Sequence, residues 1–380
     1  MNKNWSYVPF SQIFSWCKKS TIGSNDGKPS GKYKLFIASA TKIKYFDEYL
    51  EEGESLIFGT GGNPCIYYVN EKFAYTNHTE TAKKKIDNVN LKFYYYYFQK
   101  NKFEQLSTTF VGGGIKNSSK KKIGALMVPL LDIEEQNKIV AKIEELFSEL
   151  DKAVDTLQNI KKQLAVYRQA VLKEAFTECI NDVKMNDVAK MIDPQPSHRT
   201  PPEYENGVPY IGIGDIDYTK NTIKISEARK VSPTVYKEHL QRYKLHDGDF
   251  VMGKIGTIGK PFRLPLPQNY TLSANVILIQ PNHEMINPEY LFWQFSSPLI
   301  TEQLMKGKNE TSQPAFGIQK ARVLCIKMCS FENQNAIVKD IREKLSVCDN
   351  IEKTIDTVLL QSEALRQTIL KQAFEGELIK

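Results

Sequence analysis

The chain has 380 residues, of which 41% are hydrophobic and 25% are charged. This balance excludes a largely disordered chain and leaves room for two or three domains, each with its own core. A formal net charge of +7 favours an anionic partner such as nucleic acid, although many folded proteins carry a similar excess by chance.

The sequence predicts a cytoplasmic protein without a membrane partner. No run approaches the roughly 18 apolar residues that a spanning helix needs. The first residues, Met1–Trp5, lack the apolar stretch of a signal peptide. The six cysteines are scattered, which favours reduced thiols over disulfides or a zinc site.

The first block, residues 1–130, is predicted to be a mixed α/β domain. Short β-rich runs lie at Lys34–Ser39 and Ser55–Phe58, and a helix is expected at Leu91–Gln99. The aromatic run Phe93–Phe98 lies in that helix, where core packing is favoured over base stacking. Residues 1–128 carry a net charge of +9 and contain no arginine. Because bidentate Arg–guanine contacts are then unavailable, Lys, Asn, Gln, Ser or Thr would have to read bases there.

Candidate DNA contacts in this block lie mainly in one polar, cationic segment before the first long helix. Ammonium, amide and hydroxyl groups are the side chains that contact phosphates and base edges. A merely solvated loop is the alternative interpretation. The candidates are Lys116, Asn117, Lys120, Lys121 and Lys122, with Thr76 and Asn77 as second-rank candidates.

Residues 131–180 are predicted to form a long coiled-coil helix. Neither Gly nor Pro occurs from Leu130 to Asp193, and Pro129 stands where a helix start is expected. Apolar residues recur at alternating steps of four and three, which is the pattern of a coiled-coil seam. The seam comprises Ile139, Ile143, Leu146, Leu150, Ala153, Leu157, Ile160, Leu164, Tyr167 and Val171.

The second block, residues 181–328, is predicted to be another mixed domain. Its expected strands are Val208–Ile213, Asp249–Met252 and Asn275–Ile279, and a helical stretch is expected at Pro288–Lys306. The run Asp247–Gly253 resembles Glu52–Gly59, so the two blocks look like diverged versions of one module. Candidate DNA contacts are Lys306, Lys308, Asn309 and Gln313, with Lys254, Thr257 and Lys260 in a glycine-containing loop as second-rank candidates.

Residues 329–380 repeat the first long helix. Glu134–Phe176 aligns without a gap with Glu332–Phe374, and more than a third of the positions are identical. Gly376 stands where the second helix should stop. The two seams most simply pack on each other, with an intermolecular coiled coil as the alternative. Both helices are mildly acidic, which suits protein partners better than DNA.

No motif in the sequence supports catalysis. The segment Gly253–Lys260 lacks the glycine and Ser/Thr positions of a phosphate-binding loop. The five histidines show no spacing typical of metal ligands. We therefore expect no catalytic residue and no metal site in this chain.

The helix motifs resemble the conserved regions of specificity subunits of type I restriction–modification systems. The first copy opens with Glu135–Val140 and closes with Tyr167–Phe176, and the second runs from Asn333–Val338 to Leu365–Leu378. The resemblance implies an α+β fold with two α/β target recognition domains separated by two long antiparallel coiled-coil helices, related by a pseudo-two-fold internal repeat. Residues 1–130 and 181–328 would be the recognition domains, and residues 131–180 and 329–380 the spacer helices.

The resemblance also implies a function in a host defence system. Each domain would read one half of a bipartite target in double-stranded DNA. The helices would set the spacer, dock two methyltransferase (M) subunits and indirectly recruit restriction/translocase (R) subunits. The chain would bind no cofactor itself, with S-adenosylmethionine bound by the methyltransferase. The residues assigned to docking are Gln136, Arg168, Phe176, Gln334, Arg366 and Phe374.

The alternative is a coiled-coil scaffold protein with two globular domains that bind ligands other than DNA. A salt-dependent shift of duplex DNA in a binding assay would separate this scaffold from a DNA-binding subunit.

Overall fold

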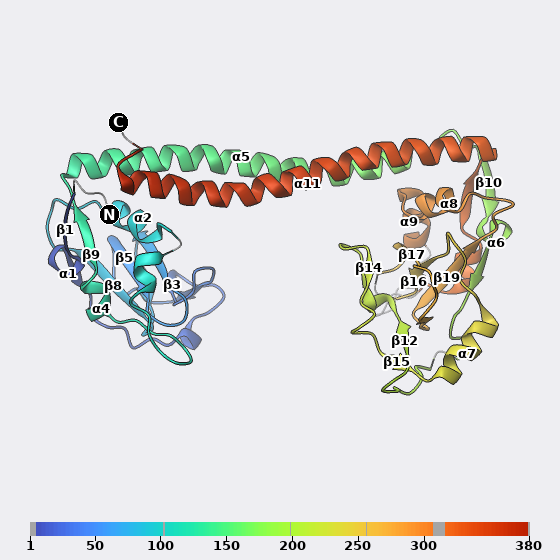
Figure 1. Cartoon of the computed structure of the whole chain (residues 1–380), viewed down its shortest axis with the longest axis horizontal. Coiled ribbons are helices and arrows are strands. Elements are labelled where there is room, and N and C mark those ends of the chain that lie inside the picture. Colours follow the sequence, from blue (N-terminus) through green and yellow to red (C-terminus); the bar gives the residue numbers. More distant parts are fainter. Residues whose placement is uncertain (1–4, 102, 198, 256, 307–315, 379–380) are drawn as a thin grey trace. The chain divides into compact units, whose positions relative to one another are not determined.

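The computed structural model describes residues 5–378 except residues 102, 198, 256 and 307–315 (Figure 1). The chain divides into two compact units, with residues 1–158 and 355–380 in unit 1 and residues 159–354 in unit 2. Each unit contains one β-rich domain and portions of both long helices. Within the described ranges, no helix is long and apolar enough to cross a membrane.

The domain of unit 1 is built from a four-stranded sheet, β2-β8-β5-β6, and a three-stranded sheet, β4-β3-β7. All pairs in these sheets are antiparallel except β3 with β7. A separate pair, β1 with β9, adjoins the long helix. The strands are β1 (Ser6–Pro9), β2 (Phe14–Trp16), β3 (Tyr33–Phe36), β4 (Ile43–Phe46), β5 (Glu54–Gly59), β6 (Cys65–Asn70), β7 (Phe73–Tyr75), β8 (Thr79–Lys84) and β9 (Met127–Leu130).

Helix α2 (Leu91–Gln99) carries much of the core of unit 1. Phe93, Tyr94 and Phe98 are buried, and Phe98 packs edge-on against Phe58 of β5 with ring centroids 5.4 Å apart. The predicted bounds of this helix and the packing interpretation of its aromatic run are confirmed. The shorter helices of unit 1 are α1 (Phe10–Ile13), η1 (Ser24–Asp26), α3 (Glu104–Ser107) and α4 (Lys120–Gly124).

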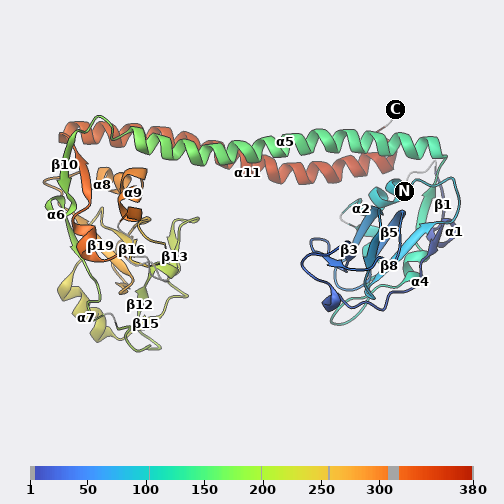
Figure 2. The same cartoon turned by 180° about the vertical axis from the view of Figure 1, so that it is seen from behind.

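The domain of unit 2 has the same topology. Its sheets are β11-β19-β16-β17 and β15-β12-β18, with one parallel pair, β12 with β18, in place of β3 with β7 (Figures 1 and 2). The two domains are therefore versions of one module, as the sequence predicts. The strands are β10 (Asn181–Lys184), β11 (Ala189–Ile192), β12 (Val208–Ile211), β13 (Ile216–Asp217), β14 (Thr222–Ile223), β15 (Lys230–Val231), β16 (Phe250–Gly253), β17 (Pro261–Arg263), β18 (Thr271–Leu272), β19 (Val276–Pro281) and β20 (Cys325–Met328).

At two prolines the secondary structure differs from the sequence-based expectation. The stretch Pro288–Lys306 is not one helix but two, α8 (Pro288–Phe295) and α9 (Pro298–Lys306). Pro298 has no N–H to continue α8 and is suited to begin a new helix instead. Pro129 lies in β9 rather than at a helix start. The remaining helices of this domain are α6 (Met185–Val188), η2 (Ile213–Asp215), α7 (Pro233–Arg242) and α10 (Ile318–Arg322).

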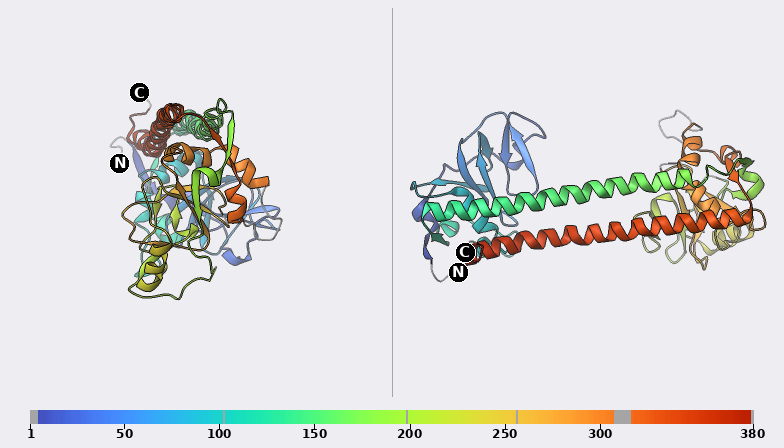
Figure 3. Two further views of the ribbon diagram at one scale, coloured as in Figure 1. Left: turned by 90° about the vertical axis from the view of Figure 1, so that its right-hand side faces the viewer. Right: turned by 90° about the horizontal axis from the view of Figure 1, so that it is seen from above.

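The long helices are α5 (Ile133–Glu174) and α11 (Phe331–Glu375), and portions of the two lie side by side in each unit (Figure 3). In unit 2, Arg168 binds Asp349 at 2.7 Å, and in unit 1 Arg366 pairs with Asp151. Arg168 is the repeat equivalent of Arg366, and Asp151 is that of Asp349, so the two ion pairs are reciprocal. Such reciprocity requires antiparallel helices, and it confirms that the two seams of one chain pack on each other.

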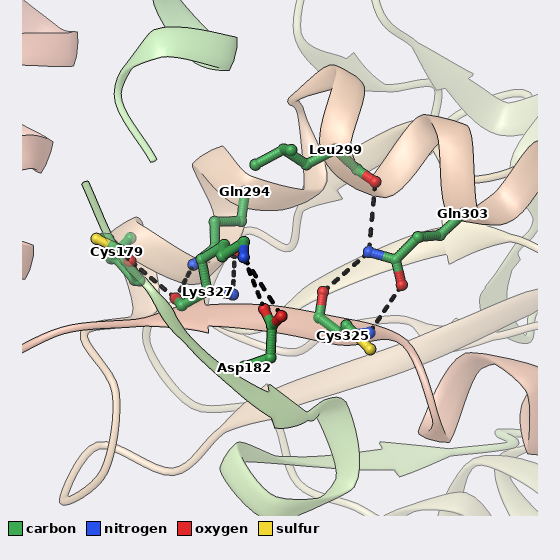
Figure 4. A network of polar contacts seen from close by, with 8 residues as sticks. Cys179, Asp182, Gln294, Leu299, Gln303, Cys325 and Lys327 are labelled. Carbon is green, nitrogen blue, oxygen red and sulfur yellow. Dashed lines mark hydrogen bonds and ion pairs between the residues drawn. The ribbon is translucent and has the colours of Figure 1, made fainter. Parts of the chain in front are cut away.

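In unit 2, strand β20 leads into α11 and is held by glutamine side chains (Figure 4). Gln294 of α8 donates from Nε2 to the carbonyl of Lys327 at 2.6 Å and accepts from its N–H at 2.9 Å. Gln303 of α9 makes the same two contacts with Cys325, at 3.0 and 2.8 Å. Each amide thus satisfies a donor and an acceptor on the free edge of the strand, as another strand would.

Candidate nucleic-acid interface

In unit 1, three segments meet just beyond the end of the central strand β5. The N–H of Thr60 donates to the carbonyl of His78 at 2.9 Å, and the N–H of Ser118 donates to the carbonyl of Thr60 at 2.8 Å. His78 lies in the turn before β8, and Ser118 lies just before α4. We call Thr60, His78 and Ser118 the strand-end site of unit 1.

Unit 2 repeats this arrangement with different residues. The N–H of Lys254 donates to the carbonyl of Asn275 at 2.8 Å, and the N–H of Phe316 donates to the carbonyl of Lys254 at 2.8 Å. The strand residues next to these positions also pair equivalently. In unit 1 Gly59 of β5 lies opposite Thr79 of β8, and in unit 2 Gly253 of β16 lies opposite Val276 of β19. Lys254, Asn275 and Phe316 therefore form the strand-end site of unit 2. The backbone is shared, and the side chains differ at all three positions.

The predicted DNA contacts of the loop in unit 1 cluster near its strand-end site. Lys116 and Asn117 are exposed, and the carbonyl of Lys116 accepts from the N–H of Gly62 at 3.0 Å. Lys120, Lys121 and Lys122 are exposed on α4, which begins two residues after Ser118. All five candidate residues of this segment are therefore open to solvent.

The second-rank candidates Thr76 and Asn77 lie deeper. Thr76 is fully buried, so its side chain offers no surface to DNA in this conformation. Asn77 is half-buried. Among the described residues, neither the hydroxyl of Thr76 nor Oδ1 of Asn77 has a hydrogen-bond partner. Both belong to the turn that carries His78, and Asn77 remains a candidate contact.

The candidate DNA contacts of unit 2 differ from one another in their exposure to solvent. The side chain of Lys254 is 11% exposed, and its ammonium lies 2.7 Å from Oδ2 of Asp193. Thr257 is exposed, and so is Lys260, whose ammonium lies 4.3 Å from the ring centre of Tyr218. Lys306 is exposed at the end of α9. Lys308, Asn309 and Gln313 lie outside the described residues.

A pocket of about 620 Å³ adjoins the strand-end site of unit 2. Its polar wall includes Arg229 and two residues that the sequence did not single out, Tyr210 and Asp215. The N–H of Ala274 donates to the hydroxyl of Tyr210 at 3.2 Å, and burial raises the pKa of this tyrosine. The pocket is lined by Thr200, Tyr210, Gly212, Asp215, Arg229, Lys254, Ile255, Ser273, Ala274, Asn275, Phe316 and Gly317.

The repeated glutamines predicted to dock partners are buried and bonded internally. Oε1 of Gln136 accepts from the N–H of Asn90, the N-cap of α2, at 2.9 Å, and its Nε2 donates to the carbonyl of Leu131 at 2.9 Å. Gln334 makes the equivalent contacts in unit 2, with the N–H of Asn287 at 2.8 Å and the carbonyl of Cys329 at 3.0 Å. Both side chains are at most 1% exposed, so any effect on a partner must be indirect.

The repeated phenylalanines and arginines also make intramolecular contacts. Phe374 is buried against Phe93 of unit 1, with ring centroids 5.2 Å apart, and Phe176 against Tyr290 of unit 2 at 5.3 Å. Arg168 and Arg366 form the reciprocal ion pairs between the helices. The two phenylalanines are buried in the fold, whereas the arginine side chains are about a quarter exposed, and the docking role of all four residues stays a prediction.

Within the part of the chain that the structure describes, no three His, Cys, Asp or Glu side chains are grouped to hold a metal ion. The chemistry of the strand-end sites is that of hydrogen-bond donors, acceptors and cations on a rigid sheet edge. Such an arrangement suits recognition.

Comparisons with known proteins agree with this picture. Residues 2–164 match the family described as Type I restriction modification DNA specificity domain. The chain is 22% identical to the Type I restriction enzyme EcoBI specificity subunit of Escherichia coli over 386 residues, covering 93% of this chain and 80% of that protein. It is 25% identical to the EcoKI specificity subunit of E. coli strain K12, covering 73% of this chain and 63% of that protein.

Solved structures show the same fold. A chain from a structure of a type I R-M system, described for its complex assembly and conformational transition, matches with a TM-score of 0.72 at 16% identity and covers 99% of both chains. The crystal structure of the HsdS subunit from Thermoanaerobacter tengcongensis matches with a TM-score of 0.58 at 15% identity, covering 99% of this chain and 98% of that one. These matches show that residues 2–164 are similar to the type I restriction modification DNA specificity domain, that the chain is similar in sequence to type I specificity subunits, and that it shares the fold of the solved HsdS subunit.

Proposed function

We propose that each β-rich domain reads one half of a split DNA target and that the two long helices set the unread spacer between the halves. The observation that carries this proposal is the pair of strand-end sites. One backbone framework presents Thr60, His78 and Ser118 in unit 1 but Lys254, Asn275 and Phe316 in unit 2. Equivalent positions with different side chains suit two related domains that recognise different bases.

The charge distribution supports the same division of labour. Residues 1–128 carry +9 and residues 181–328 carry +3, whereas the segments 129–180 and 329–380 carry −3 and −2. Cationic domains attract the phosphate backbone, and acidic helices repel it. The helices are therefore better suited to protein partners than to DNA.

An apolar groove on the helix pair of unit 1 is the surface that we assign to a methyltransferase subunit. Its volume is about 490 Å³. Leu365, which borders the groove, is 48% exposed, and its repeat equivalent in unit 2, Tyr167, is 49% exposed. The groove is lined by Leu150, Ala153, Leu157, Val358, Gln361, Ser362, Ala364, Leu365 and Thr368.

Two equivalent apolar patches in one chain would dock two copies of the same methyltransferase subunit. S-adenosylmethionine would then be bound by those subunits, and restriction subunits would join the assembly through them. In the cytoplasm such a complex has direct access to DNA.

The proposed function is tested by mapping methylated adenines in cells that carry this chain with its methyltransferase subunit. The expected result is one bipartite motif, with two defined half-sites and a spacer of fixed length but free sequence. A cell lacking only this chain is the control and should lose that motif. Methylation at a single continuous motif would contradict the proposal, and unchanged methylation in the control cell would favour the scaffold alternative.

A further inference from the structure

We propose that the pocket at the strand-end site of unit 2 selects a guanine in the second half of the DNA target by donating hydrogen bonds to its acceptor edge. This inference rests on the proposed function, because it assigns a base to a domain already proposed to read DNA. It is carried by Asn275, Lys254 and the charges around them.

Asn275 presents a fixed donor. Its Oδ1 accepts from the N–H of Ile213 at 3.1 Å and from the hydroxyl of Ser273, which defines the orientation of the amide. Its Nδ2 has no hydrogen-bond partner among the described residues. The backbone lies close to this amide, since a Cβ added at Gly212 would come within 3.0 Å of Oδ1. The group of Asn275 that is available to a ligand is therefore its Nδ2 amide, an N–H donor in a fixed orientation.

Lys254 is a second donor, with its charge already balanced. Its ammonium is buried and, apart from the ion pair with Asp193, has no hydrogen-bond partner within the described ranges, so donation to a base requires the side chain to turn toward the pocket. The carboxylates of Asp193 and Asp215 offset the cations of Lys254 and Arg229. These carboxylates would repel a phosphate, whereas a neutral base edge is not repelled by their charge.

The remaining walls are largely apolar. Tyr210, Ala274 and the buried Phe316 line the pocket, and its volume of about 620 Å³ is ample for the edge of a base that stays paired in the duplex. Guanine is the base whose major-groove edge offers two acceptors, O6 and N7, and lysine is a frequent partner of both. Adenine and cytosine each place an amino donor there, which would face the N–H groups of Asn275 and Lys254.

The equivalent site of unit 1 has neither the ammonium nor the side-chain amide. Thr60 replaces Lys254, and His78 replaces Asn275. The same framework should therefore prefer a different base at this position of the first half-site.

The test uses the full chain in complex with its methyltransferase subunits and a duplex library randomised at both half-sites. The wild type should prefer guanine at one position of the second half-site. Lys254→Thr, which introduces the residue found at this place in unit 1, should reduce that preference about tenfold or more. In Asn275→Asp, one carboxylate oxygen still accepts from the N–H of Ile213. The other oxygen, which is an acceptor, replaces the Nδ2 donor. This variant should shift the preference toward adenine or cytosine.

Two controls make the outcome decisive. Lys237→Thr, an exposed position on α7, should leave both half-sites unchanged. Replacing the preferred guanine by 7-deazaguanine should weaken binding of the wild type more than that of Lys254→Thr. An unchanged first half-site in every variant also shows that the complex has assembled.

Three results would overturn the inference, and they are distinguishable. If both variants keep the wild-type base preference, the pocket does not read a base, although the bipartite target still supports the proposed function. If Lys254→Thr weakens binding to all DNA sequences equally and lowers the slope of log K against log salt by about one, Lys254 binds a phosphate instead. If the wild type shows no sequence preference in either half, the proposed function itself fails.

Discussion

At the scale of single residues, the repeated glutamines of the two long helices serve the fold. Gln136 and Gln334 each bond the start of a short helix in their own domain and are buried. A buried amide with two partners stabilises the fold by about 1 kcal/mol per hydrogen bond, and removing it would leave buried groups unpaired. The residues that differ between the domains, such as Thr60 and Lys254, instead lie at the strand-end sites.

The exposed lysines of α4 give a residue-scale prediction. Replacing Lys120, Lys121 and Lys122 together by alanine removes three cations beside the strand-end site of unit 1. If all three contact phosphates, the slope of log K against log salt should fall by about 2.7, with weaker binding to every sequence. Binding measured at several salt concentrations checks this.

The matched control for the α4 lysines is Lys152→Ala, an exposed cation on α5 that should leave the slope unaltered. An unaltered slope in the triple variant would exclude direct phosphate contact by α4.

At the scale of elements, the helix pair leaves part of its apolar seam uncovered. Ile139 and Ile143 are buried, but Ile160 and Tyr167 of the same seam are at least 36% exposed. In α11, Ile351 and Leu365 are exposed in the same way. Two helices alone cannot cover a seam on all sides, and an exposed apolar patch of this kind favours a protein partner.

The exposed seam gives an element-scale prediction about stoichiometry. Leu365→Glu places a charge in the groove of unit 1 and should remove one methyltransferase subunit from the complex. Tyr167→Glu, at the equivalent position of unit 2, should remove the other, and the double variant should bind none. Native mass spectrometry of the purified complex measures the count.

Lys152→Glu, which adds an acidic residue to α5 outside the groove, is the control and should retain both methyltransferase subunits. Retention of two subunits by the double variant would show that docking occurs elsewhere.

The sequence predicts elements well where the determining contacts are local. The bounds of α2 follow from its N-cap Asn90 and its aromatic run, and the end of α11 follows from Gly376, which adopts a φ of +80°. The break before Pro298 was missed because apolar residues continue on both sides of it.

The candidate site was only partly predictable. The cationic loop of unit 1 is visible as a run of lysines in the sequence. The pocket of unit 2 is not, because it depends on the parallel pairing of β12 with β18 and on the contact between Lys254 and Asp193. These partners are about 60 residues apart, and neither carries a local motif.

At the scale of the whole molecule, the proposed role of the two helices is to set the distance between the half-sites. The boundary between the compact units crosses α5 after Gln158 and α11 after Thr354. A seven-residue insertion at both points keeps the seam nearly in register and adds about 10 Å of helix to each. At about 3.4 Å per base pair, that length corresponds to roughly three base pairs of DNA.

The most direct measurement is therefore the methylated motif of this double-insertion variant, mapped beside that of the wild type in cells with the same methyltransferase subunit. If the helices set the spacer, both half-sites should stay the same and the spacer between them should grow by about three base pairs. An unchanged spacer, in a variant that still methylates both half-sites, would contradict the claim that the helices set the distance between two reading domains.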